Sequence, residues 1–325
     1  VLKLLTAEDT GAVYAAATTS LPDVFGGRSN WDYRYNWIRD ANFAVQALSN
    51  LGQADAARRY CEWCLDVCHD DPADVQPLYG AHGETDLTEH FLDHLAGYRF
   101  STPVRVGNLA AEQRQLDAYG IIVQGVYEVV RHGERLSQED WQWISRIVDH
   151  VCDVWDERDS GIWEFRVKPR HYVHSKLLCW VALDRGIRLA DRRDGDADAD
   201  RRAAERAKLR DAIEERGYSE AAGSFVQHFD TDETLDASSL LVPMYEFLPP
   251  DDDRVQSTLD AVVDGLLTED GLVQRAKGPD VPPDGRGAFL FCSFWLVDAL
   301  VLAGRVEEAR DRFTTVLDHL DPPYL

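Results

Sequence analysis

The sequence Asn30-Trp31-Asp32-Tyr33-Arg34-Tyr35-Asn36-Trp37-Ile38-Arg39-Asp40 places four aromatic residues and an Arg–Asp pair within eleven positions. It lies directly before a run of residues with helical periodicity. Aromatic faces stack on sugar rings, and an adjacent cation and carboxylate can bind hydroxyl groups in defined directions. The stretch therefore predicts a carbohydrate-binding site at the start of a helix.

The composition is typical of a globular chain with a substantial core. The chain has 325 residues, of which 45% are hydrophobic and 28% are charged, and this length allows one large domain or two smaller ones. No apolar run approaches the roughly 18 residues of a membrane-spanning helix. Residues 1–5 are too few for the apolar part of a signal peptide and lack a cleavage pattern. We therefore expect a cytoplasmic protein.

The net charge is −24, from 34 Lys and Arg against 58 Asp and Glu. Such a surface repels nucleic acid and anionic lipid, so we expect neither nucleic acid nor a membrane as a partner. The same charge destabilises the compact state by self-repulsion unless salt screens it. We expect a salt-adapted protein of a high-salt cytoplasm, with an ordinary acidic protein as the alternative.

Three of the six cysteines resemble a metal cluster at first sight. Cys61, Cys64 and Cys68 stand at positions i, i+3 and i+7, beside His69. The same spacing is typical of the buried stripe of a helix, and a second pair of ligands is lacking. We predict core packing, no metal site and no organic cofactor.

Helical periodicity dominates the chain, and strand-like alternation is almost absent. Helices are expected near residues 1–8, 39–51, 54–69, 109–132, 137–156, 172–191, 198–217, 236–247, 252–267, 288–303 and 305–320. Longer connections follow every second helix, at 9–38, 70–108, 157–171, 218–235 and 268–287. Functional residues tend to lie in such connections. The pattern predicts one all-α domain over 1–325, built of helical hairpins with elaborate loops at one end.

A second segment that could hold a catalytic residue is Gly161-Ile162-Trp163-Glu164-Phe165-Arg166. Its Glu164 lies between large apolar side chains in a loop that joins two helices. Apolar surroundings disfavour the ionised form of a carboxyl group, as a general acid near neutral pH requires. The alternative is an ordinary loop glutamate paired with Arg166.

Several motifs in one order resemble glycoside hydrolase family 15, the glucoamylase-like family whose prokaryotic members include trehalases and glucodextranases. The first is the opening stretch with its continuation, Asn-Trp-Asp-Tyr-Arg-Tyr-x-Trp-Ile-Arg-Asp-Ala. The resemblance covers essentially the whole chain. Its motifs occupy residues 18–50, 92–98, 103–108, 115–120, 161–166, 174–176, 180–185 and 287–296.

The resemblance implies an (α/α)6 barrel, of which this sequence provides about eleven of the twelve helices. It also implies hydrolysis of α-glucosidic bonds with inversion, releasing β-glucose from non-reducing ends. We expect a glucoamylase-like enzyme acting on maltooligosaccharides. The alternatives are a trehalase of the same family and a catalytically deficient fragment that binds sugar without turnover.

By position, the resemblance also implies roles for individual residues. Glu164 resembles the general acid that protonates the leaving oxygen, and Tyr33 resembles the tyrosine beside the developing oxocarbenium ion. Trp31 and Tyr35 are more simply explained as core aromatics. The substrate-binding set that the resemblance implies is Arg39, Asp40, Tyr33, Trp37, Trp163, Arg105 and Arg275.

The match with the family breaks at the catalytic base. An inverting glycosidase needs a second carboxylate about 6.5–9.5 Å from the acid, and in the family this Glu follows the eleventh helix. Here the sequence ends at residues 318–325 without such a segment, so we expect the general base and the closing helix to be absent from this chain. An open barrel edge would favour self-association. Arg286 also replaces a usual Glu, and we nominate none of the remaining loop carboxylates as the base: Asp230, Asp232, Glu233, Asp280 and Asp284.

The net charge of −24 makes a testable prediction about salt. We expect the Tm to rise by about 5 °C or more between dilute buffer and molar KCl, because salt screens the self-repulsion of the folded surface. Thermal unfolding followed by circular dichroism measures the change, with sorbitol at equal osmolality as the uncharged control. An unchanged Tm in KCl would contradict salt adaptation.

Overall fold

A computed structural model describes residues 2–193, 198–279, 281–282 and 287–320. The chain divides into two compact units. The first unit is Val1–Trp155 with Leu178–Arg206, and the second is Asp156–Leu177 with Ala207–Leu325. The single domain expected over residues 1–325 stays a prediction.

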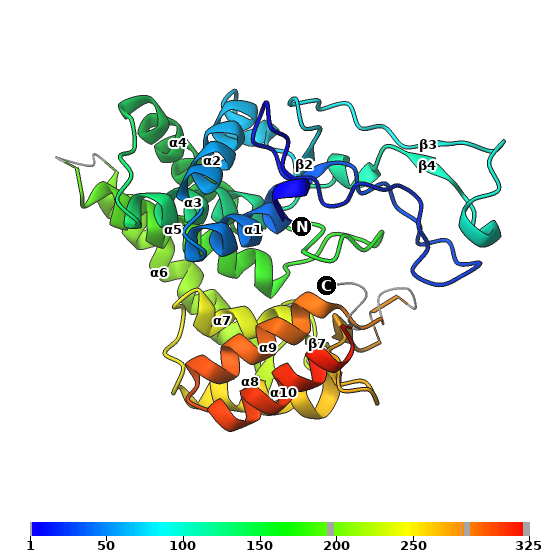
Figure 1. The fold of residues 1–325 in the computed structure, drawn as a ribbon. Helices are drawn as coiled ribbons and strands as arrows, with labels where there is room; N and C mark the ends of the chain where they lie inside the picture. The colour runs from blue at the N-terminus through cyan, green and yellow to red at the C-terminus, as the bar shows by residue number, and fades with distance from the viewer. Residues whose placement is uncertain (1, 194–197, 280, 283–286, 321–325) are drawn as a thin grey trace. The chain divides into compact units, whose positions relative to one another are not determined.

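The first unit is a set of packed helices with long loops (Figure 1). Helix α1 packs against α2 and α3, and α3 also packs against α4. Helices α5 and α6 begin or end in the second unit. The bounds are η1 Leu2–Leu4, α1 Ile38–Asn50, α2 Ala54–Cys68, η2 Pro72–Asp74, η3 Tyr98–Phe100, η4 Leu109–Glu112, α3 Asp117–Arg131, α4 Gln138–Val154, α5 Val173–Ala190 and α6 Ala199–Arg216.

Helix α3 is the centre of this unit. Every residue from Asp117 to Glu128 is buried, which is typical of a helix covered on all sides rather than one with a solvent face. Helices α1, α2 and α4 are amphipathic by comparison, with their buried residues on one side. Helix α4 begins where the Ser137 hydroxyl accepts a hydrogen bond from the backbone N of Asp140 at 3.0 Å, a typical N-cap.

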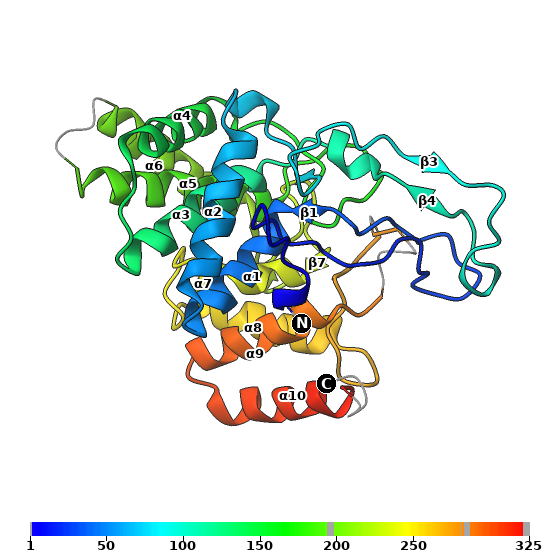
Figure 2. The ribbon, with the colours of Figure 1, turned by 45° about the horizontal axis from the view of Figure 1, so that its top comes forward.

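Short antiparallel ladders fix the long loops of the first unit. Strand β1, Asn36–Trp37, pairs with β2, Leu78–Tyr79, directly before α1. Strand β3, His90–Phe91, pairs with β4, Arg105–Val106. In both ribbon views, β3 and β4 lie on an arm of loops that extends away from α2 and α4 (Figure 2).

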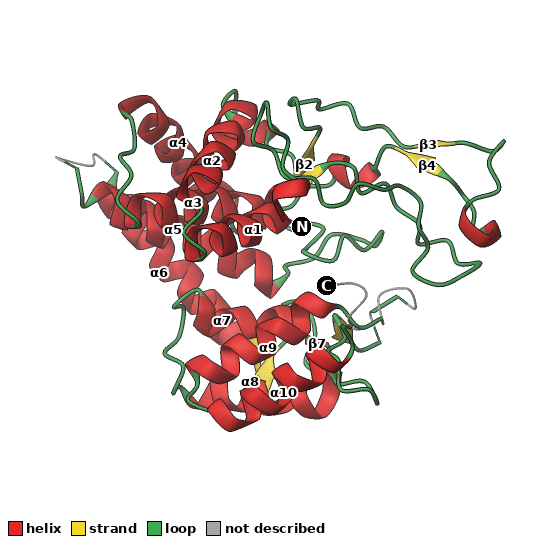
Figure 3. Cartoon of the chain, in the orientation of Figure 1, coloured by secondary structure: helices red, strands yellow, loops and turns green. Residues whose placement is uncertain are grey.

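The second unit has its own helical core. Helix α9 packs against α10 and α7, and α8 packs against two of the ladders. The strands are brief interruptions of the loops between helices (Figure 3). The bounds are β5 Tyr218–Ser219, β6 Ser224–Phe225, β7 Leu235–Asp236, η5 Ala237–Leu240, α7 Leu241–Met244, α8 Asp253–Leu266, β8 Ala276–Lys277, α9 Leu290–Leu302 and α10 Val306–Asp318.

Most predicted helices are confirmed, and three are corrected. The helix expected near 1–8 is only a single 3-10 turn, because the chain folds back and Thr6 bridges Val13. The helix expected from 109 begins at Asp117, since Asn108 caps a separate 3-10 turn. The helix expected over 236–247 consists of η5 and a short α7, which ends before Glu246 turns left-handed with φ +61°.

The cysteine stripe of α2 packs in the core as predicted. Cys61, Cys64 and Cys68 are buried and make no disulfide. Burial raises the pKa of the Cys61 thiol to about 12, so this thiol stays protonated near neutral pH. Within the described ranges, no helix is both long and apolar enough to cross a membrane.

Helix α3 and the start of α5 approach too closely for a side chain at Gly120. A Cβ at this position would lie 2.1 Å from the carbonyl oxygen of Leu178, whereas one at Gly125 would meet only the Asn42 side-chain oxygen at 2.9 Å. We expect Gly120→Ala to lower the free energy of unfolding by about 1–3 kcal/mol. Gly125→Ala is the matched control, because the helix-propensity gain of about 1 kcal/mol offsets a small side-chain shift. Urea unfolding of both variants measures the difference, and equal effects would contradict the close approach.

Candidate active site

The first unit holds the Arg–Asp pair at the start of α1. The Arg39 side chain is buried, and its Nη1 donates to Gln115 Oε1 at 2.8 Å and to Asp117 Oδ2 at 3.2 Å. Its Nη2 lies 3.7 Å from Asp40 Oδ2, while the Asp40 side chain keeps 37% of its surface exposed. A fixed guanidinium beside an accessible carboxylate can orient the hydroxyl groups of a sugar.

The aromatic residues of the same stretch divide between core and surface. Trp37 is buried in a cluster with Leu78 and Leu87, and Tyr33 and Tyr35 pack against this cluster with part of their surface exposed. The ring centroids of Tyr33 and Trp37 are 5.9 Å apart. Tyr33 is therefore the more accessible ring, and Trp37 mainly supports it.

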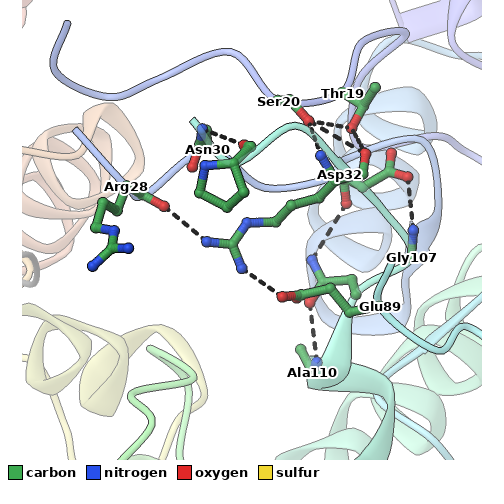
Figure 4. A network of polar contacts seen from close by, with 11 residues as sticks. Thr19, Ser20, Arg28, Asn30, Asp32, Glu89, Gly107 and Ala110 are labelled. Carbon is green, nitrogen blue, oxygen red and sulfur yellow. Dashed lines mark hydrogen bonds and ion pairs between the residues drawn. The ribbon is translucent and has the colours of Figure 1, made fainter. Parts of the chain in front are cut away.

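Arg105 is held in place by the protein itself (Figure 4). Its Nη1 donates to Glu89, its Nη2 donates to the carbonyl oxygen of Arg28 at 2.9 Å, and its Cζ lies 4.2 Å from the centre of the Trp31 ring. The side chains of Glu89 and Arg105 are both almost fully buried. Glu89 was missed by the sequence reasoning, because only the register of β3 and β4 brings it to Arg105. A role for Arg105 in binding substrate stays a prediction.

Asp32 anchors the aromatic stretch to the neighbouring loop (Figure 4). Its carboxylate accepts two hydrogen bonds of 2.8 Å from the Arg34 side chain and one of 3.1 Å from the backbone N of Gly107. Burial raises the pKa of Asp32, but the bonds from Arg34 and Gly107 outweigh it and hold the pKa below its ordinary value. The ionised form of Asp32 therefore stabilises this fold.

The second unit holds the loop that carries Glu164. Asp159 and Arg170 close this loop through a pair of backbone hydrogen bonds, and the Ser175 hydroxyl donates to Asp159 Oδ2 at 2.6 Å. Gly161 has φ +69°, and a Cβ there would lie 2.6 Å from the ring of Tyr172. Only glycine fits this turn. The loop is thus a defined structure that presents the half-buried Glu164.

Trp163 is fixed on several sides. Its indole Nε1 donates to Asp236 Oδ2 at 2.8 Å, and its ring lies 6.3 Å from that of Phe289 and 6.2 Å from that of Trp295. The Arg275 Cζ lies 5.7 Å from the centre of the same Phe289 ring. The second unit therefore brings Trp163 and Arg275 together around Phe289, and their role in binding substrate stays a prediction.

Asp236 is the main residue that sequence reasoning missed in this unit. It is almost fully buried and also accepts a 2.9 Å bond from Gln227 Nε2 and a 2.8 Å bond from the Ser238 backbone N. Burial raises the pKa of Asp236, and the bonds from Ser238, Gln227 and Trp163 oppose this only in part. In sequence, an Asp before Ala-Ser-Ser signals only a helix cap.

The loop carboxylates that the sequence analysis did not nominate as the general base remain without that role. Asp230, Asp232 and Glu233 are exposed loop residues. Asp280, Asp284 and Arg286 lie outside the described residues. Among the described residues we assign no general base, and the roles expected for Glu164 and for the sugar-binding residues stay predictions.

Comparisons with known proteins agree on one family. The profile of the family described as "Glycosyl hydrolases family 15" matches residues 1–320. The chain is 42% identical to a protein named "Trehalase" from Mycobacterium tuberculosis, over 99% of this chain and 48% of that protein. It is 40% identical to a "Trehalase" from Mycolicibacterium smegmatis, over 100% of this chain and 49% of that protein. The chain thus spans about half the length of these curated relatives.

The fold is also found among solved structures. A structure titled "Glycosidase Wild Type" superposes with a TM-score of 0.77 at 22% identity, covering 98% of this chain and 81% of that one. At this identity the likeness shows the fold alone. Together with the family match, it places the helical fold in the (α/α)6 barrel class.

The Asp32 anchor predicts a pH-dependent stability. Its pKa in the folded state lies below the ordinary 3.8, so its stabilising effect is fully present above that value and is lost as the pH falls through the folded pKa. We expect Asp32→Asn to lower the free energy of unfolding by about 1–2 kcal/mol at pH 7, because Arg34 is partly exposed to solvent. The deficit should shrink below pH 3.8.

Urea unfolding at several pH values measures this deficit. Asp55→Asn is the control, since the Asp55 side chain is 98% exposed and its loss should change stability little. A deficit for Asp32→Asn that stays constant from pH 7 to below 3.8 would contradict the role of the ionised carboxylate.

Proposed function

Because the chain belongs to family 15 of the glycosyl hydrolases, we propose that the protein hydrolyses trehalose with inversion at the attacked carbon. Glu164 is the general acid of this reaction. Arg39 and Asp40 bind the glucose unit, with Tyr33 beside the ring. Trp163, Trp37, Arg105 and Arg275 complete the proposed set by supporting or contacting the sugar.

One observation carries the choice of substrate. The sequence analysis put maltooligosaccharides first and trehalose second, and no single residue separates them. The curated relatives at 40% identity and above, matched along essentially the whole chain, carry the name trehalase. A structure titled as a bacterial glucoamylase is matched at only 14% identity. These likenesses support trehalose over maltooligosaccharides.

The proposed chemistry follows from the substrate. Trehalose joins two glucose units through both anomeric carbons, so either half can be the leaving group. The acid protonates the bridging oxygen and the bond to one anomeric carbon breaks. A water molecule attacks that carbon from the opposite face as it passes its proton to a general base, which we do not assign among the described residues. The attacked unit becomes β-glucose, and the departing unit keeps its α configuration. Inversion therefore releases equal amounts of the two anomers.

The geometry of the first unit suits recognition of a terminal glucose. Arg39 is immobilised by Gln115 and Asp117, so binding a hydroxyl group costs little side-chain entropy. Asp40 provides an exposed acceptor beside it. Charged groups held in this way bind hydroxyls more strongly than neutral ones.

The proposal is tested by proton NMR of trehalose in high salt with the gene product that carries these 325 residues, because inversion needs a general base and none is assigned among the described residues. We expect α- and β-glucose to appear in equal amounts before mutarotation. Glu164→Gln should reduce the rate by about 10²-fold or more, because an amide cannot donate the proton. Maltotriose should be cleaved more slowly than trehalose.

The matched control is Asp156→Asn, which removes an exposed carboxylate from the same connection. It should leave the rate unchanged. Faster cleavage of maltotriose than of trehalose would overturn the substrate assignment. Release of α-glucose alone would overturn inversion. Binding of trehalose by the folded chain without hydrolysis would support the alternative of a sugar-binding protein.

A further inference from the structure

We infer that Asp236 is a positioning residue for the general acid, acting through the indole of Trp163. This inference rests on the proposed function, since it assumes that Glu164 donates the proton. The contacts that support it all lie within the second unit.

The peptide at Glu164 adopts a conformation that needs support. Glu164 has φ +57°, in the left-handed region that non-glycine residues rarely adopt. Such a residue persists only where its surroundings hold it, and it marks a functional constraint more often than chance. Its backbone N donates a hydrogen bond of 3.4 Å to the Gly161 carbonyl oxygen. The adjacent residue, Trp163, is itself held by contacts on several sides and can support this conformation.

Trp163 is fixed by a polar contact as well as by packing. Ring contacts with Phe289 and Trp295 restrict the plane of the indole, but the hydrogen bond to Asp236 determines which way its N–H edge points. A hydrogen bond to a buried carboxylate is stronger than one at the surface, because the local dielectric constant is lower and removal of the donor leaves the acceptor unsatisfied. Loss of the acceptor would release the indole and with it the neighbouring peptide.

Asp236 is itself held in place by its backbone and by its carboxylate. Its backbone pairs with Ala276 in the β7–β8 ladder, and the next residue, Ala237, donates its N–H to the Arg275 carbonyl oxygen at 2.9 Å. Its carboxylate carries the Gln227 and Ser238 bonds in addition to that of Trp163. Asp236 thus connects the loop of Glu164 to strand β8 and to Arg275, the residue directly before that strand.

A simple capping role does not account for these contacts. Asp252 also caps a helix in this unit and accepts from the backbone N two residues ahead, at 2.9 Å, as Asp236 does from Ser238 at 2.8 Å. Asp252 is otherwise bonded by the Arg254 side chain. The additional Trp163 and Gln227 bonds are what distinguish Asp236.

The test compares two substrates that differ in their need for an acid. Trehalose needs a proton on its leaving oxygen, whereas α-glucosyl fluoride releases fluoride without one. We expect Asp236→Asn to lower kcat/KM for trehalose by about 10²-fold, the cost of misplacing a catalytic group by an ångström. The value for α-glucosyl fluoride should stay close to that of the wild type. Trp163→Phe should give the same selective loss, and the double variant should lose little more.

The matched control is Asp252→Asn, which should affect the two substrates alike. The indole ¹H–¹⁵N signal of Trp163, identified by its absence in Trp163→Phe, should shift in Asp236→Asn and stay in place in Asp252→Asn. This signal reports the placement of the indole without any turnover.

Equal losses on both substrates in Asp236→Asn, or an unmoved indole signal, would overturn the inference. A wild-type chain that cleaves α-glucosyl fluoride and maltotriose but not trehalose would overturn the proposed substrate alone. In that case maltotriose replaces trehalose in the comparison of variants.

Discussion

Buried carboxylates must be surrounded by hydrogen-bond donors, and this constraint holds the functional loops of both units in place. A carboxylate removed from water loses a large solvation energy, which only charged partners or several N–H and O–H groups replace. Asp32 meets this requirement with Arg34 and Gly107, and Asp236 meets it with Trp163, Gln227 and Ser238. Each of these residues connects segments that would otherwise be independent loops.

The same principle explains why two buried arginines, Arg39 and Arg105, differ in what their guanidinium groups contact. Arg39 and Arg105 are both buried, and both donate hydrogen bonds to acceptors within the protein. Arg39 adjoins a carboxylate that remains accessible, as the sugar-binding role proposed for the pair requires. Arg105 lies between Glu89 and the face of Trp31, where its first effect is to organise the loops around it. A basic residue in a family motif can therefore act by fixing its neighbours.

How far the sequence predicts this structure depends on whether a feature is local. The helices α2, α4 and α8 follow from apolar periodicity and from caps such as Ser137. The expected helix at 1–8 fails, because pairing of Thr6 with Val13 outweighs a weak local pattern. The aromatic stretch and the loop of Glu164 are both visible in the sequence. Their partners, Glu89 and Asp236, are ordinary polar residues there and become notable only through contacts distant in sequence.

By itself, the sequence determined the all-α class and the family and pointed to the Glu164 loop and the Arg–Asp pair, because periodicity and long motifs are properties of neighbouring residues. Only the tertiary structure decided that Arg105 is clamped by Glu89 and Arg28, and that Trp163 is anchored by Asp236. Such pairs depend on strand register and on burial, which arise when distant segments pack together. The residues that will form a buried polar contact therefore cannot be recognised from their neighbours in the sequence.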